Sequence, residues 1–261
     1  MKVITFVLTI MVSVFSLANE LSAKTVEYGV QDKYEGYLVF SKKIKKNAPA
    51  IIMIPNWMGL TAETKKQAER FAKLGYVVFA ADIYGKGLNP KNSNEAGVLA
   101  TKYKADRKLF RDHLNLALIE LRKQKNINTN KIAAVGYCFG GTGAIELARS
   151  GADITGVISF HGGLDSPAPN DGKNIKAKIL ALHGAIDPYV AATDVNAFED
   201  EMKNNHVDYQ LVKYSGTVHS FTEVGAGIDI TKGAAYNEVS DRRSFLAAEN
   251  FLSEIFNANL K

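Results

Sequence analysis

The sequence contains a single cysteine, Cys138, among 261 residues. An intramolecular disulfide is therefore impossible. The chain also lacks internal repeats, low-complexity tracts and any linker, so nothing divides it into several domains. Metal-ligand spacing is absent among the histidines, which are His113, His161, His183, His206 and His219. We expect no metal site, and for His161 and His183 we expect a packed structural role.

The sequence has no strong charge of either sign. Its formal net charge is +5, and the lysines and arginines are scattered over different segments, such as 42–46 and 122–131. No nucleic-acid-binding motif accompanies them, so we expect no nucleic-acid partner. Hydrophobic residues make up 46% of the chain and charged residues 23%, which is typical of one soluble domain with a substantial core.

The N-terminus carries the one long apolar run. Lys2 precedes an uncharged segment over residues 3–15, and no charge follows until Glu20. This run suits the core of a signal peptide and is too short for a comfortable membrane span. Small residues predict cleavage after Ala18 or Ala23. We therefore expect a signal peptide over residues 1–23, a mature domain over 24–261 that is free of the membrane, and a periplasmic or secreted location. The alternative is an uncleaved amphiphilic anchor.

Short apolar runs alternate with helical segments along the rest of the chain. Residues 50–54, 76–80, 131–135 and 179–182 are predicted to be buried strands. Residues 157–160 and 210–214 are also predicted to be strands, and 37–40 an edge strand. Residues 61–74, 94–125, 142–148, 194–204 and 241–255 are predicted to be helices. This alternation indicates an α/β fold with a doubly wound, mostly parallel sheet flanked by helices.

Cys138 lies in a glycine-rich turn between a predicted strand and a predicted helix. The motif is Gly136-Tyr137-Cys138-Phe139-Gly140-Gly141, which has the G-x-nucleophile-x-G pattern of a strained elbow. Glycines are needed there because a Cβ would strike the neighbouring strand or helix. The start of a helix also favours thiolate over thiol. We interpret Cys138 as a nucleophile; the alternative is a small buried hydrophobic residue.

Two further residues complete a catalytic hypothesis. Asp187 follows one predicted strand, and His219 lies in the loop after the next. The order nucleophile, acid, histidine is that of the α/β-hydrolase triad. His219 would take the Cys138 proton, and Asp187 would fix its tautomer.

The chain resembles the dienelactone hydrolase family from about Tyr34 to Phe256. The residues that carry the resemblance are the cysteine elbow, His183-Gly184 with Asp187, Gly216 with His219-Ser220-Phe221, Ala81-Asp82-Ile83-Tyr84-Gly85, Ala235-Tyr236-Asn237 and Asp241-Arg242-Arg243-Ser244. The resemblance implies a single α/β-hydrolase domain that opens small esters or lactones with a Cys-Asp-His triad and no cofactor. It also implies that the backbone N–H groups of Trp57 and Phe139 form the oxyanion hole.

Three positions depart from the family pattern. Where these enzymes have a glutamate that contacts the resting cysteine, this chain has Asn56; where they hold a substrate carboxylate with two arginines, it has Lys86 and Glu223. We expect all three to border the substrate cleft and Glu223 to make neutral esters better substrates than anionic ones. Because Asn56 cannot ionise, a hydrolase-fold binding protein with lost turnover is the alternative function.

Overall fold

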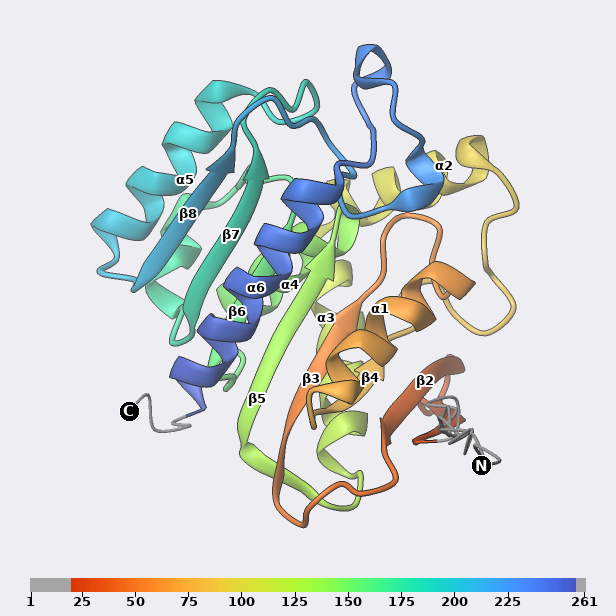
Figure 1. Ribbon diagram of the computed structural model, residues 1–261. Helices are drawn as coiled ribbons and strands as arrows, with labels where there is room; N and C mark the ends of the chain where they lie inside the picture. Colours follow the sequence, from red (N-terminus) through yellow and green to blue (C-terminus); the bar gives the residue numbers. More distant parts are fainter. Residues whose placement is uncertain (1–19, 257–261) are drawn as a thin grey trace, which may run out of the picture.

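The computed structural model describes residues 20–256, which form one eight-stranded sheet with helices on both faces (Figure 1). The strand order is β1-β2-β4-β3-β5-β6-β7-β8. β1 and β2 run antiparallel to their neighbours, and the pairs from β4 to β8 are all parallel. The α/β class and the mostly parallel sheet are thus confirmed.

Apart from β1, each strand overlaps one of the apolar runs of the sequence. The strands are β1 (Leu21–Tyr28), β2 (Tyr34–Ser41), β3 (Ala48–Ile54), β4 (Val77–Ala80), β5 (Ile127–Tyr137), β6 (Gly156–Phe160), β7 (Lys178–Gly184) and β8 (Tyr209–Tyr214). β4 and β6 are buried along their whole length, as expected for parallel strands covered on both faces.

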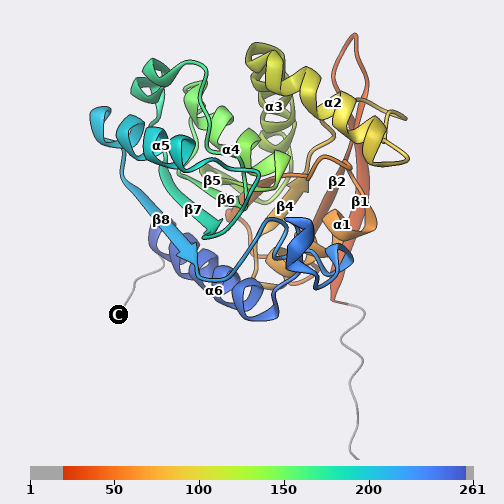
Figure 2. The same cartoon turned by 90° about the horizontal axis from the view of Figure 1, so that it is seen from above.

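Helices cover the sheet in two layers (Figure 2). They are α1 (Ala62–Lys73), α2 (Ser93–Ala105), α3 (Arg107–Arg122), α4 (Phe139–Arg149), α5 (Ala192–Asn204) and α6 (Glu238–Ile255). α1 and α6 lie on one face, and α2, α3, α4 and α5 lie on the other. Each face has its own apolar core, in which Phe71 and Phe251 pack on the first face and Phe110 and Phe198 on the second.

Two predicted elements differ from the structure. The strand predicted at 37–40 belongs to β2, which lies inside the sheet because β1 covers its outer side. The helix predicted over 94–125 is two helices, α2 and α3, separated at Asp106. The Asp106 carboxylate accepts a hydrogen bond from Leu109 N at 2.9 Å, so this residue caps the N-terminus of α3 and interrupts the helical path.

The signal-peptide prediction falls mostly on residues 1–19, outside the described residues. Residues 20–23 are described, and Leu21–Ala23 belong to β1, paired with Val39–Ser41 of β2. Within residues 20–256, the helices are too short or too polar to cross a membrane.

Candidate active site

Cys138 occupies a strained turn between β5 and α4. Its backbone has φ 54° and ψ −119°, a left-handed conformation that few non-glycine residues adopt. A Cβ on Gly136 would lie 1.8 Å from Gly140 O, and one on Gly140 would lie 2.2 Å from Ile54 O. The elbow is therefore possible only with glycine at both positions, as the motif predicts.

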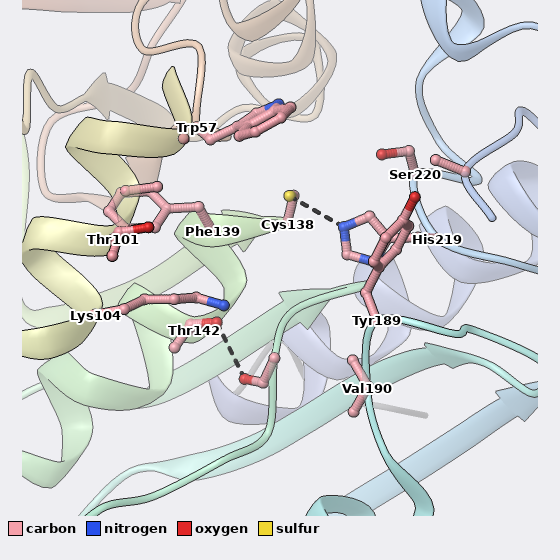
Figure 3. Close-up of a pocket in the computed structure, with 14 residues that line it drawn as sticks. Trp57, Thr101, Lys104, Cys138, Phe139, Thr142, Tyr189, Val190, His219 and Ser220 are labelled. Atoms are coloured by element: carbon pink, nitrogen blue, oxygen red, sulfur yellow. Dashed lines mark hydrogen bonds between the residues drawn. The ribbon is translucent and has the colours of Figure 1, made fainter. Parts of the chain in front are cut away.

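His219 connects Cys138 to Asp187. His219 Nε2 lies 3.0 Å from Cys138 Sγ (Figure 3). His219 Nδ1 lies 2.7 Å from Asp187 Oδ2. The second oxygen of Asp187 accepts a hydrogen bond from Tyr189 N at 2.9 Å, which fixes the carboxylate after β7. The fold therefore brings together the three residues that the sequence predicts as a triad. They follow the carboxyl ends of β5, β7 and β8, and β6 separates β5 from β7 in the sheet.

His219 is held in its protonated form. Burial lowers the pKa of His219, since it disfavours the charged imidazolium, but the neighbouring charges and hydrogen bonds of Cys138 and Asp187 outweigh this effect and raise the pKa to about 10. An imidazolium at neutral pH is the partner that stabilises an ionised thiol. His219 Nε2 is thus placed to exchange a proton with Cys138 Sγ.

A second histidine, His161, supports the elbow from behind. It is fully buried, and its pKa is lowered well below the usual value by burial and by the charge of His219. Its Nδ1 accepts a hydrogen bond from Cys138 N at 3.2 Å, which leaves Nε2–H to donate to Thr222 Oγ1 at 2.8 Å. His161 is thus a neutral packed residue, as expected. It leaves His219 as the only imidazole that reaches the thiol among residues 20–256.

Two backbone amides lie at the mouth of the elbow. Phe139 N is the first amide of α4, and Trp57 N comes from the loop after β3. Within residues 20–256 neither amide donates to a protein acceptor. The Trp57 carbonyl is held by Tyr84 Oη, which donates to it at 2.8 Å. Both N–H groups are thus available to an external oxygen.

A cavity of about 360 Å³ opens over the thiol (Figure 3). Trp57, Phe139, Tyr189 and Val190 give it largely apolar walls. The rest of the lining comes from Cys138 and His219, from Gly97, Ala100, Thr101 and Lys104 of α2, from Thr142 of α4, and from Gly163, Ser220 and Ala234 in loops. The segment after β6 and the segment before α6 therefore both border the cavity, through Gly163 and Ala234.

None of the three predicted cleft residues lines this cavity. Lys86 borders a separate cavity beside Tyr34 and His113, and its ammonium is paired with Glu27. Asn56 and Glu223 are hydrogen-bonded to each other and face a small cavity against α1. The prediction that Glu223 borders the substrate cleft is therefore wrong, because its carboxylate bonds Asn56 and lines the small cavity against α1.

The sequence interpretation missed the cation that does line the cavity. Lys104 extends from α2 into the cavity toward Thr142 (Figure 3). The α2 residues of the lining have the spacing i, i+3, i+4, i+7, at positions 97, 100, 101 and 104, so they share one helical face. That spacing was present in the sequence. Leu114, Leu118 and Leu121 are buried on α3, and the prediction of one helix over 94–125 does not separate their face from that of α2.

Comparisons with known proteins agree with the architecture. Residues 34–256 match the dienelactone hydrolase family. "Protein usf" of Aquifex pyrophilus is 30% identical over 72% of this chain and 82% of its own length. A probable 2-oxo-3-(5-oxofuran-2-ylidene)propanoate lactonase of Bradyrhizobium sp is 29% identical over 67% of this chain and 74% of its own. The crystal structure of a dienelactone hydrolase-like promiscuous phosphotriesterase from metagenomic libraries superimposes with a TM-score of 0.85 at 32% identity, covering 90% of this chain and 99% of that one.

Proposed function

Since this chain belongs to the dienelactone hydrolase family and is a hydrolase of the ester and lactone type, we propose that Cys138, Asp187 and His219 are its catalytic triad. The observation that carries this proposal is the unbroken sequence of contacts from Sγ through the imidazole to the buried carboxylate, at 3.0 and 2.7 Å. An apolar cavity opens directly over the sulfur. A nucleophile, a base and a residue that orients the base are thus within reach of one another.

In the acylation step, the Cys138 thiolate attacks the carbonyl carbon of the substrate. The carbonyl electron pair moves onto the oxygen, which is held by the N–H groups of Trp57 and Phe139. When the tetrahedral intermediate collapses, the C–O bond to the leaving group breaks. The leaving oxygen takes the proton from His219 Nε2. When the substrate is a lactone, the released alcohol and the acyl group remain parts of one molecule. The cavity must therefore hold the whole opened chain.

In the deacylation step, His219 is neutral and takes a proton from water while the water oxygen attacks the thioester. The second tetrahedral intermediate expels Cys138 as a thiolate, and the carboxylic acid leaves. Asp187 keeps Nδ1–H directed at itself through both steps, so that Nε2 always faces the thiol.

Alkylation of the single thiol tests this assignment. With Cys138 as the only cysteine, one equivalent of iodoacetamide should abolish hydrolysis of p-nitrophenyl acetate, and a slowly hydrolysed ester should protect the enzyme. Cys138→Ala should lose activity at least 10³-fold. Activity in the fully alkylated enzyme would refute the nucleophile assignment. Tight ester binding without turnover in the wild type would support the alternative of a binding protein.

We further propose that the substrate carries a carboxylate on the part that lies against α2. Lys104 is the only lysine or arginine among the residues lining the cavity, and no aspartate or glutamate joins it there. Lys104 forms no ion pair within residues 20–256; the nearby Asp165 is bonded to Arg107 at 2.5 Å. The named substrate of the Bradyrhizobium relative, a furanylidene propanoate, has both a lactone ring and a carboxylate.

For the N-terminus we propose export, with cleavage after Ala18 in preference to Ala23. Cleavage after Ala23 would remove Leu21, Ser22 and Ala23, which pair with β2. It would also remove Glu20, whose carbonyl accepts a hydrogen bond from Lys42 N at 2.8 Å. N-terminal sequencing of the protein from its native host should therefore find Asn19 first. A chain that begins at Lys24, or an intact Met1, would contradict this proposal.

A further inference from the structure

The Trp57 amide of the proposed oxyanion hole and the His219 imidazole lie in different loops. The loop after β3 carries Trp57, and the loop after β8 carries His219. Catalysis by the proposed mechanism needs the Trp57 amide and the imidazole at fixed positions around one tetrahedral carbon. A contact that joins the two loops can fix the position of the Trp57 amide relative to the imidazole. The side-chain hydrogen bond between Asn56 and Glu223 is such a contact.

Asn56 makes that connection with both ends of its amide. Its Oδ1 accepts a hydrogen bond from Met58 N at 2.9 Å, and its Nδ2 donates to Glu223 Oε1 at 3.0 Å. The first bond closes a tight turn whose central residue is Trp57. Gly59 N strengthens the same turn by donating to the Asn56 carbonyl at 3.0 Å. The orientation of the Trp57 peptide therefore depends on where the Asn56 side chain is held.

Glu223 in turn is fixed to the histidine loop. Its backbone N–H donates to Ser220 O at 2.9 Å, which closes a turn immediately after His219. The neighbouring Thr222 is held by His161 through its hydroxyl and by Gln67 through its carbonyl. Glu223 itself forms no ion pair within residues 20–256, and Asn56 Nδ2 is the side-chain donor that its carboxylate contacts there.

From these contacts we propose that Asn56 and Glu223 are positioning residues that align the oxyanion hole with His219. This inference rests on the proposed function, because it presumes that Trp57 N–H and His219 act on the same substrate. Neither residue lines the cavity over Cys138, so neither touches the substrate. They act through the Trp57 peptide. Loss of their bond weakens stabilisation of the oxyanion and leaves the pairing of the thiol with His219 intact.

The test uses four variants that differ in hydrogen-bonding capacity. Glu223→Gln keeps an acceptor for Asn56 Nδ2, whereas Glu223→Leu removes it at similar size. Asn56→Asp keeps the acceptor for Met58 N but places two carboxyl groups against each other. The double variant Asn56→Asp/Glu223→Gln restores one donor and one acceptor with the direction reversed. A thermal melt of each variant accompanies the kinetics.

We expect Glu223→Leu and Asn56→Asp to lower kcat about tenfold to hundredfold with little change in KM. Glu223→Gln should retain more kcat than Glu223→Leu, and the double variant should recover most of the loss in Asn56→Asp. Inhibition by butanal should weaken in parallel with kcat. Butanal adds reversibly to the thiol: an S–C bond forms, the C=O π bond breaks and the oxygen is held in the oxyanion hole. The rate of alkylation by iodoacetamide, which needs no oxyanion hole, should stay unchanged.

Two results would overturn the inference. One is equal kcat in Glu223→Gln and Glu223→Leu, and the other is a double variant no faster than Asn56→Asp. Glu223→Gln and Glu223→Leu form one comparison, and Asn56→Asp and the double variant form the other. If a variant of one comparison fails to fold, the other comparison still tests the inference. Failure of the proposed function would look different, because the wild type would then stay active after alkylation of Cys138.

Discussion

The elbow that holds Cys138 and the α2 wall of the cavity face each other across the same space, but they are built differently. Around the elbow, backbone approaches backbone so closely that a methyl group at Gly136 or Gly140 has no room. The α2 wall is packed less tightly, since a Cβ on Gly97 would meet only Trp57 at 3.8 Å. The elbow therefore tolerates almost no substitution and sets the chemistry. The wall tolerates change and is suited to select the substrate.

The largest effect should follow from adding one methyl group to the elbow. We expect Gly136→Ala to abolish activity or to prevent folding, because its Cβ would lie 1.8 Å from Gly140 O and backbone cannot move aside. Gly225→Ala is the matched control, since its Cβ would meet nothing within 4 Å. Soluble yield, melting temperature and ester hydrolysis are the measurements. A Gly136→Ala enzyme as active as the control would show that the elbow is less tightly constrained than the contacts indicate.

The next largest effect should come from Asp187. We expect Asp187→Asn to lower kcat about 10³- to 10⁴-fold, because His219 loses the partner that fixes its tautomer. The wild type should lose activity at alkaline pH as the imidazolium deprotonates near its raised pKa of about 10. Removing the Asp187 charge removes one cause of the rise, so the alkaline limit of Asp187→Asn should move to lower pH. An unchanged limit in a pH profile of kcat/KM would mean that another group titrates.

A moderate and selective effect should come from the α2 wall. We expect Lys104→Met to lower kcat/KM about five- to tenfold for the mono-p-nitrophenyl ester of adipic acid and to leave p-nitrophenyl hexanoate nearly unchanged. The two esters differ only by the terminal carboxylate, and Lys104 is exposed to solvent, which limits the effect. Lys102→Met is the control, since Lys102 lies over the Tyr103 ring and does not line the cavity. An unchanged ratio of the two esters would refute an anion contact at Lys104.

The smallest effect concerns stability. Burial raises the pKa of Glu223, although the Asn56 hydrogen bond and the charge of His219 lower it. The folded state therefore holds the Glu223 proton more tightly than the unfolded chain does, so ionisation costs stability as pH rises above the normal range of a glutamate. We expect Glu223→Gln to raise the melting temperature at pH 7 by about 2–4 °C and to change it less at pH 4. A lower melting temperature at pH 7 would show that the carboxylate is stabilising there.

The positions of Asp187 and His219 after strand ends explain why the sequence could predict these two residues of the candidate site. Asp187 and His219 follow apolar strands that the sequence marks clearly, and in a parallel sheet the carboxyl ends of neighbouring strands meet at one edge. Gly136 and Gly140, which the turn at Cys138 requires, are close to it in the sequence, so a short motif is enough to identify the turn. β1 was not predicted, since residues 21–23 were assigned to a signal peptide. Three successive residues of β1, Ala23, Lys24 and Thr25, are exposed, so no apolar run marks this strand, which forms by pairing with β2.

The sequence by itself determined the α/β alternation, the cysteine elbow and the order of the three proposed triad residues. These follow from local periodicity and from steric limits on a single turn. Only the tertiary structure decided which side chains surround the thiol. Lys86 and Glu223 were assigned to the cleft by their places along the chain, whereas Lys104 enters it and Glu223 turns to Asn56. The physical reason is that lining a cavity depends on the rotation of a helix and on contacts between distant loops, and neither is encoded in the spacing of a local motif.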